Sequence, residues 1–183
     1  MSISNLEVYP KGTWEIDPSH SDVSFTVRHL MISKVRGSFG NISGRIVNSE
    51  SEVTAEGLID VTSINTNDEN RDGHLRSADF FEVEKFPTMS FALTEVLPTK
   101  KSDEFKVVGN MTIKDVTRRV EFDVELSPAI KDGYGQTKIG ITASTSINRG
   151  DFGLTWNTAL ETGGVLVSDE VKIQIEAQAV LNS

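Results

Sequence analysis

The sequence predicts an all-β fold, an antiparallel barrel or sandwich of about eight strands, with one short helix or lid segment around residues 68–82. Apolar and polar residues alternate along most of the chain, as they do in strands with one buried face and one face in water. Short polar turns join these segments, whereas a parallel sheet would need crossover helices. Gly37, Gly40 and Gly44 supply bends that let a sheet coil, and closure would remove exposed sheet edges. We therefore expect a closed barrel.

The elements can be followed along a single domain that spans residues 1–183. We expect residues 1–11 to be a loosely ordered N-terminal segment and the ordered part to begin at Gly12. Residues 17–20, which include Asp17 and Pro18, break the pattern of the first strand. The alternating segments after this break are residues 23–29, 35–39, 42–47, 53–61, 89–93, 105–113, 120–126, 139–147 and 171–179. Turns between later strands are expected at residues 100–103, 115–118 and 132–133.

Residues 70–87 depart from the alternation. Arg71, Asp72 and His74 lie close together there, and Phe80 and Phe81 follow them. We expect this segment to cross the barrel as a short helix and lid, with both phenylalanines turned toward the apolar interior. The charged residues either orient a ligand at the mouth of the barrel or tie the segment onto it. We favour the structural alternative, because Asp and Arg often form internal ion pairs.

Composition excludes several classes of function. The formal net charge is −9, so sequence-independent nucleic-acid binding, which depends on clustered cations, is not expected. The absence of cysteine excludes disulfides, thiolate zinc sites and thiol nucleophiles. The sequence contains no run of about 18 apolar residues, which a membrane-spanning helix would require. The amino terminus as written lacks the features of a signal peptide and predicts a cytoplasmic protein, although an exported chain trimmed at its cleavage site would look the same.

The sequence also lacks the motifs of common enzymes, such as a zinc-protease motif, a nucleophile elbow or a phosphate-binding glycine loop. His20, His29 and His74 are widely spaced and form no metal-ligand pattern. We therefore expect no catalytic residue, no metal and no cofactor. A His-based enzyme stays a minor alternative, because the histidines could meet in the fold near Asp17 or Asp72.

Several blocks of residues occur in a recognisable order along nearly the whole chain. They are Trp14 to Asp17 with His20 and Ser21, Phe25 to His29, Ser63 to Thr66, Arg71 to Leu75, Asp79 to Phe81, Phe86 with Pro87, Gly109 to Arg118, and Arg149 to Gly153. In these blocks the chain resembles the YceI-like family, the lipocalin-like polyisoprenoid-binding proteins. The resemblance implies a hollow barrel that takes a long isoprenoid chain or a similar amphiphile into an apolar tunnel, for transport or storage. It implies no established reaction, and the analogy also allows a homodimer. Many relatives resemble exported proteins, which leaves the compartment open.

A barrel of this kind needs an apolar wall and a polar mouth. The residues expected on the tunnel wall are Phe25, Val27, Phe39, Ile59, Phe80, Phe91, Ile141 and Ile173. The residues expected near the head group of a ligand are His29, Arg71, Asp72, His74, Arg149 and Trp156. Each wall residue reads equally well as an ordinary core residue, because about eight strands lie on the border between a filled and a hollow barrel. A filled barrel that serves as a stress-response or interaction module without lipid cargo is the alternative.

Overall fold

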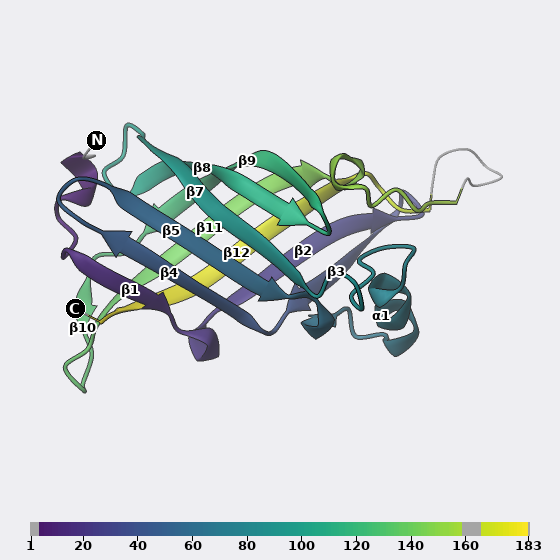
Figure 1. Ribbon diagram of the computed structural model, residues 1–183, viewed down its shortest axis with the longest axis horizontal. Coiled ribbons are helices and arrows are strands. Elements are labelled where there is room, and N and C mark those ends of the chain that lie inside the picture. Colours follow the sequence, from purple (N-terminus) through teal and green to yellow (C-terminus); the bar gives the residue numbers. More distant parts are fainter. Residues whose placement is uncertain (1–3, 159–165, 183) are drawn as a thin grey trace.

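Antiparallel strands make up most of the protein, as the computed structural model of residues 4–158 and 166–182 shows (Figure 1). The strands are β1 (Gly12–Ile16), β2 (Asp22–His29), β3 (Ser33–Phe39), β4 (Ile42–Asn48), β5 (Val53–Asp60), β6 (Ile64–Asn65), β7 (Thr88–Pro98), β8 (Glu104–Ile113), β9 (Val116–Leu126), β10 (Ile130–Lys131), β11 (Thr137–Asn148) and β12 (Glu170–Leu181). The described residues also include one α-helix, α1 (Glu69–Arg76), and four short 3-10 helices: η1 (Ser4–Leu6), η2 (Pro18–His20), η3 (Val61–Ser63) and η4 (Arg149–Phe152).

Eight strands close into a barrel. The ring of hydrogen-bonded neighbours runs through β1, β4, β5, β7, β8, β9, β11 and β12 and returns to β1, and every pair is antiparallel. Strands β2, β3 and β6 extend this ring toward one end: β2 pairs with β12 and β3, and β6 pairs with β3. The structure therefore confirms the antiparallel barrel with one short helix.

The break expected at residues 17–20 is a bend between two strands that share a partner. Ile16 of β1 pairs with Ala179 of β12, and Val23 of β2 pairs with Ile175 of the same strand. The Asp17 carboxylate caps η2 by accepting a hydrogen bond from the Ser19 amide at 3.0 Å. Hydrogen bonds from the Ser19 hydroxyl first, and from His20, lower the pKa of Asp17 to about 2. The bend thus lets β1 and β2 follow one another along the same partner strand, β12.

The N-terminal segment differs from the loosely ordered stretch that the sequence predicted. Within its described part, Leu6 and Tyr9 are buried and pack with Trp14 of β1 in a cluster at one end of the barrel. Asn48 of β4 donates hydrogen bonds to the Tyr9 and Pro10 carbonyls, both at 3.3 Å. This segment closes the barrel end, because its apolar side chains lie over the interior. The sequence did not predict this packing, because the apolar residues of the segment follow no strand or helix period.

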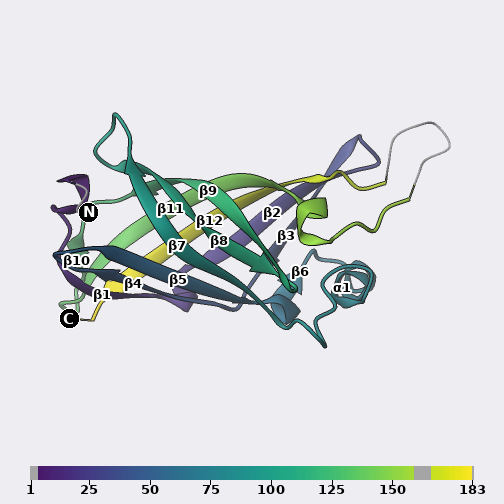
Figure 2. The ribbon, with the colours of Figure 1, turned by 45° about the horizontal axis from the view of Figure 1, so that its top comes forward.

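Helix α1 lies at the opposite end of the barrel from both termini (Figures 1 and 2). Its N-cap is Asp68, whose carboxylate accepts the Arg71 amide at 3.0 Å. The short helix expected in this region is confirmed, and Phe80 and Phe81 pack against the core. None of the helices in the described ranges combines the length and apolarity that a membrane crossing requires.

One turn is shorter than the sequence predicted. Residues 115–118 were expected to form it, but Val116 already pairs with Ile113, so only Lys114 and Asp115 connect β8 to β9. Lys114 has φ 58°, which a two-residue hairpin requires at its first central position. Val116, Thr117 and Arg118 therefore belong to β9 and not to the turn.

Candidate ligand-binding cavity

An elongated cavity of about 530 Å³ occupies the inside of the barrel. It is lined by Leu6, Tyr9 and Trp14 at the closed end and reaches His29, Arg71 and Trp156 at the end that carries α1. We call this second end the mouth. Between the two ends the wall is built almost entirely from apolar side chains of the inward faces of the strands. The volume is within the range of small-molecule sites, about 300–1,000 Å³.

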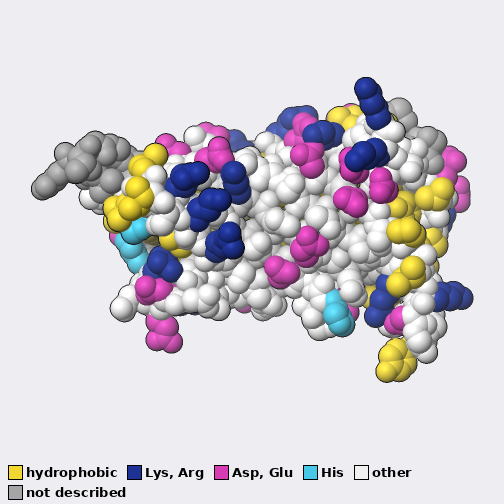
Figure 3. All heavy atoms as spheres, turned by 180° about the vertical axis from the view of Figure 1, so that it is seen from behind, with side chains coloured by type: hydrophobic (Ala, Val, Ile, Leu, Met, Phe, Trp, Pro, Cys, Tyr) yellow, Lys and Arg dark blue, Asp and Glu magenta, His cyan; other side chains and the backbone are white. Residues whose placement is uncertain are grey.

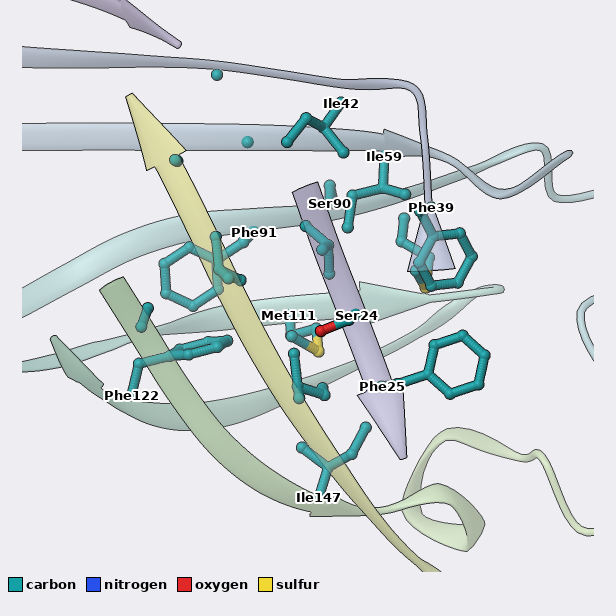
Figure 4. Close-up of a pocket in the computed structure, with 18 of the residues that line it drawn as sticks. Ser24, Phe25, Phe39, Ile42, Ile59, Ser90, Phe91, Met111, Phe122 and Ile147 are labelled. Atoms are coloured by element: carbon teal, nitrogen blue, oxygen red, sulfur yellow. The ribbon is translucent and has the colours of Figure 1, made fainter. Parts of the chain in front are cut away.

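The structure places all eight residues predicted for the tunnel wall on this cavity: Phe25, Val27, Phe39, Ile59, Phe80, Phe91, Ile141 and Ile173. Figure 4 shows Phe25, Phe39, Ile59 and Phe91 among the side chains that surround the open space. Phe91, Ile141 and Ile173 point inward yet are only partly buried, because the space in front of them is not filled by other side chains. Contact of these residues with a ligand stays a prediction.

Two glycines keep aromatic rings against the wall. Gly37 of β3 pairs with Phe25 of β2, and a Cβ at Gly37 would lie 2.7 Å from the Phe25 Cε1 atom. Gly109 of β8 is likewise covered by the ring of Phe91. Because only glycine leaves room above the backbone, the rings lie flat over the strands and the centre of the barrel stays open. Phe91 also packs edge to face on Phe122 of β9, with ring centroids 5.4 Å apart.

Arg71 brings a cation to the mouth. Its Nε donates to the Thr66 hydroxyl and its Nη2 to the Thr66 carbonyl, both at 2.8 Å. These two bonds hold the guanidinium at the cavity, while Nη1 has no hydrogen-bond partner among the described residues. Arg71 therefore keeps donors for a phosphate or a similar acceptor.

Asp72 does not line the cavity, although the sequence placed it near the head group. It is buried, and its carboxylate accepts hydrogen bonds from the Thr66 amide at 2.8 Å and the Thr66 hydroxyl at 2.5 Å. Thr66 thus connects Arg71 and Asp72, and this carboxylate secures the connection between β6 and α1. Asp72 therefore attaches the helical segment to the barrel, which is the structural alternative that the sequence offered.

His74 and Trp156 do lie at the mouth, where they form an aromatic group with Phe80. The His74 ring contacts Trp156 edge to face at 4.7 Å between centroids and Phe80 at 5.1 Å. His74 Nε2 also lies 2.8 Å from a carboxylate oxygen of Asp79. The histidine is therefore fixed by its neighbours, and the group offers a ligand an apolar rim.

Arg149 is buried, and backbone carbonyls take up its donors. Its guanidinium donates to the carbonyls of Leu154 at 2.6 Å, Trp156 at 2.8 Å and Ser168 at 2.9 Å. Burial lowers the pKa of Arg149, and Asp169 at 3.8 Å opposes this shift. Arg149 organises the chain after β11 around itself, so a structural function accounts for its position.

His29 ends the inward-facing row of β2 and lines the cavity at the mouth. Its imidazole makes no hydrogen bond with any residue in the described ranges. Among the described residues, neither the His29 imidazole nor Arg71 Nη1 has a hydrogen-bond partner, so both combine a place on the cavity with hydrogen-bonding groups that a ligand can use.

The histidines do not form a common site. His20 lies 2.8 Å from Asp17 on the bend between β1 and β2, and His74 pairs with Asp79 beside α1. In the part of the chain that the structure describes, no three His, Asp or Glu side chains are arranged to hold a metal ion.

Comparison with known proteins adds a family to this geometry. The sequence model of the YceI-like domain family matches residues 14–179 of this chain. The chain belongs to the YceI-like family. This YceI-like chain is also 39% identical over 166 residues to a UPF0312 protein of Staphylococcus aureus strain MSSA476, which covers 88% of this chain and 94% of the relative.

Solved structures show the same fold. A Campylobacter jejuni YCEI protein superimposes with a TM-score of 0.72 at 31% identity, over 85% of this chain and 90% of that one. Burkholderia cenocepacia BcnA gives a TM-score of 0.74 at 21% identity, over 89% and 98% of the two chains. A polyisoprenoid binding domain from Saccharophagus degradans gives 0.68 at 16% identity, over 92% and 98%. The last two are distant enough in sequence to show the fold alone.

Sequence reasoning missed several residues of the YceI-like cavity. Leu6 and Tyr9 close its end, and Met111 and Phe122 add to its wall. The alternation in β8 and β9 already placed Met111 and Phe122 on the inward face, so a fuller use of that pattern would have found them. Thr66 gave no signal, because its role depends on the contact with α1.

Proposed function

We propose that this YceI-like protein binds a long isoprenoid-type amphiphile, with the apolar chain inside the barrel and the head group at the mouth. The observation that carries the proposal is the continuous apolar cavity with the Arg71 guanidinium and the His29 imidazole at its mouth, where Arg71 Nη1 and the imidazole have no hydrogen-bond partner among the described residues. An amphiphile has the same distribution of polarity. Membership of the YceI-like family, for which the resemblance implies the same ligand class, supports the proposal.

The expected affinity can be estimated from chain burial. Each buried CH₂ contributes about 0.8 kcal/mol, so an isoprene unit contributes roughly 3 kcal/mol before the entropy lost by ordering the chain is subtracted. A few units therefore suffice for tight binding, and the closed end formed by Leu6, Tyr9 and Trp14 would limit the length of chain that fits.

Extraction of the purified protein with organic solvent, followed by mass spectrometry, tests for a bound amphiphile. The extracted protein is then offered a polyprenol and the matching polyprenyl phosphate, and loading is measured. Phe91→Arg should abolish loading because it places a charge in the cavity, whereas Leu97→Arg on the exposed face of β7 should load normally, because Leu97 does not line the cavity. Circular dichroism must show that both variants are folded. A protein that carries and accepts no lipid would instead be the filled interaction module.

Arg71→Gln tests the position of the head group. If the guanidinium binds phosphate, the variant should lose about tenfold to a hundredfold in affinity for the polyprenyl phosphate and little for the polyprenol, because hydrogen bonds to charged groups are worth about 1.5–3 kcal/mol. Equal losses for both lipids would mean that Arg71 only supports the lid through Thr66.

A further inference from the structure

The hairpin between β2 and β3 exposes three consecutive apolar residues at the mouth. Leu30, Met31 and Ile32 connect the strands, and their side chains are 37%, 50% and 81% exposed. We call these three residues the hairpin tip. The tip follows directly after His29, which lines the cavity, so it lies beside the mouth. Single exposed apolar residues are ordinary, but three in one projecting turn are not.

The backbone of the hairpin tip makes these residue types more unusual. The Ile32 amide donates to the His29 carbonyl at 3.2 Å, and Leu30 and Met31 between them have φ of 54° and 61°. Asn and Gly are the usual residues in such a turn, because a bulky side chain is strained in the left-handed region. The tip therefore carries large apolar side chains where neither the backbone nor the protein core favours them, which points to a contact outside the chain.

The outer face next to the hairpin tip is positively charged, although the whole chain has a net charge of −9. The strand register brings together Arg28 with Lys34 and Thr26 with both Arg36 and Lys172. We call Arg28, Lys34, Arg36 and Lys172 the basic face. All four side chains are exposed, and none forms an ion pair with another described residue. Figure 3 shows Lys and Arg side chains gathered beside hydrophobic ones at one end of this side of the molecule.

We propose that the hairpin tip and the basic face dock the protein on an anionic phospholipid bilayer. Apolar side chains that enter the headgroup region, flanked by unpaired Lys and Arg that attract anionic lipids, are the combination that holds proteins at a membrane surface. The charge complementarity selects an anionic bilayer, and the projecting shape of the tip suits a fluid surface better than the groove of a folded partner. Docking would place the mouth against the lipid.

Docking as such does not depend on the identity of the cargo, but its use in loading rests on the proposed function. The two are therefore measured separately. Docking is tested by co-sedimentation with vesicles of phosphatidylcholine alone and of phosphatidylcholine mixed with phosphatidylglycerol, without added cargo. Cargo loading is tested in detergent solution without vesicles, so a failure of one measurement leaves the other informative.

The wild-type protein should bind the mixed vesicles and bind them less as salt is raised. The double variant Lys34→Gln/Arg36→Gln should bind them about 30-fold more weakly, since each cation near an anionic surface contributes about fivefold. Met31→Ser/Ile32→Ser should lose binding to a similar extent while keeping its thermal midpoint, because neither side chain is part of the core.

The matched control is Ile130→Ser/Tyr134→Ser. These two side chains are 61% and 95% exposed, but they lie near β10 at the opposite end of the barrel (Figure 1). The control variant should bind mixed vesicles as the wild type does. Absence of vesicle binding by the wild type, equal binding to both kinds of vesicle, or an equal loss in the control variant would each overturn the proposal. Retention of a soluble protein partner by the tip without vesicle binding would overturn it as well.

Discussion

A larger side chain at Gly57 would distinguish a hollow barrel from a filled one. Gly57 lies on the inward face of β5 and lines the cavity. A Cβ added there meets only the Ser43 carbonyl oxygen, at 3.7 Å, which is an ordinary contact, and the backbone φ is not positive. Gly57→Leu should therefore place a leucine side chain in open space without strain.

The effect on stability and on binding should differ in sign. The folded protein should keep or gain stability, because replacing glycine in a strand is worth about 0.5–1 kcal/mol and the leucine side chain is withdrawn from water. The four added carbons displace about four CH₂ groups of a bound chain, which corresponds to roughly 3 kcal/mol or about a hundredfold in affinity. Gly57→Ala adds a single carbon and should weaken binding only about fourfold.

Both quantities can be measured on the same samples. Urea unfolding gives the free energy of unfolding, and titration with a polyprenyl phosphate can be followed by tryptophan fluorescence, because Trp14 and Trp156 line opposite ends of the cavity. A loss of about 1–3 kcal/mol of stability in Gly57→Leu would mean that the interior is already packed and would refute the hollow barrel. Unchanged affinity in a stable variant would show that the lipid chain does not pass Gly57.

Three further substitutions test the framework around the cavity. Gly109→Ala should cost about 1–3 kcal/mol in urea unfolding, because its Cβ would overlap the Phe91 ring and approach the Ala92 carbonyl to 2.5 Å; an unchanged midpoint would mean that the ring moves freely. Arg149→Gln should destabilise the protein by about 3 kcal/mol, since it leaves buried carbonyls without donors, and wild-type stability would contradict its structural role. Asp17→Asn should lower the thermal midpoint at neutral pH. Because the pKa of Asp17 is lowered from 3.8 to about 2 in the folded protein, its ionised form stabilises the fold above pH 3.8, and the difference between wild type and variant should shrink as the pH falls toward 2. A constant difference across that range would contradict the assignment.

The sequence alone determined the strands and the direction of their side chains. Strand alternation is local, because successive side chains of an extended backbone point to opposite faces. For this reason Ile59, Phe91 and Ile141 could be assigned to the barrel interior before the structure was known. The departure from alternation at residues 70–87 located α1 in the same way.

The tertiary structure alone decided whether the interior is open and which polar residues face it. Arg71 and Asp72 are neighbours in sequence and both hydrogen-bond to Thr66, yet Arg71 lines the cavity whereas Asp72 is buried away from it. Residues 4–11 close the barrel through contacts with β1 and β4 that no local pattern encodes. Open space inside a barrel depends on how side chains from eight strands meet at its centre, and that is a property of the closed ring, which no single strand contains.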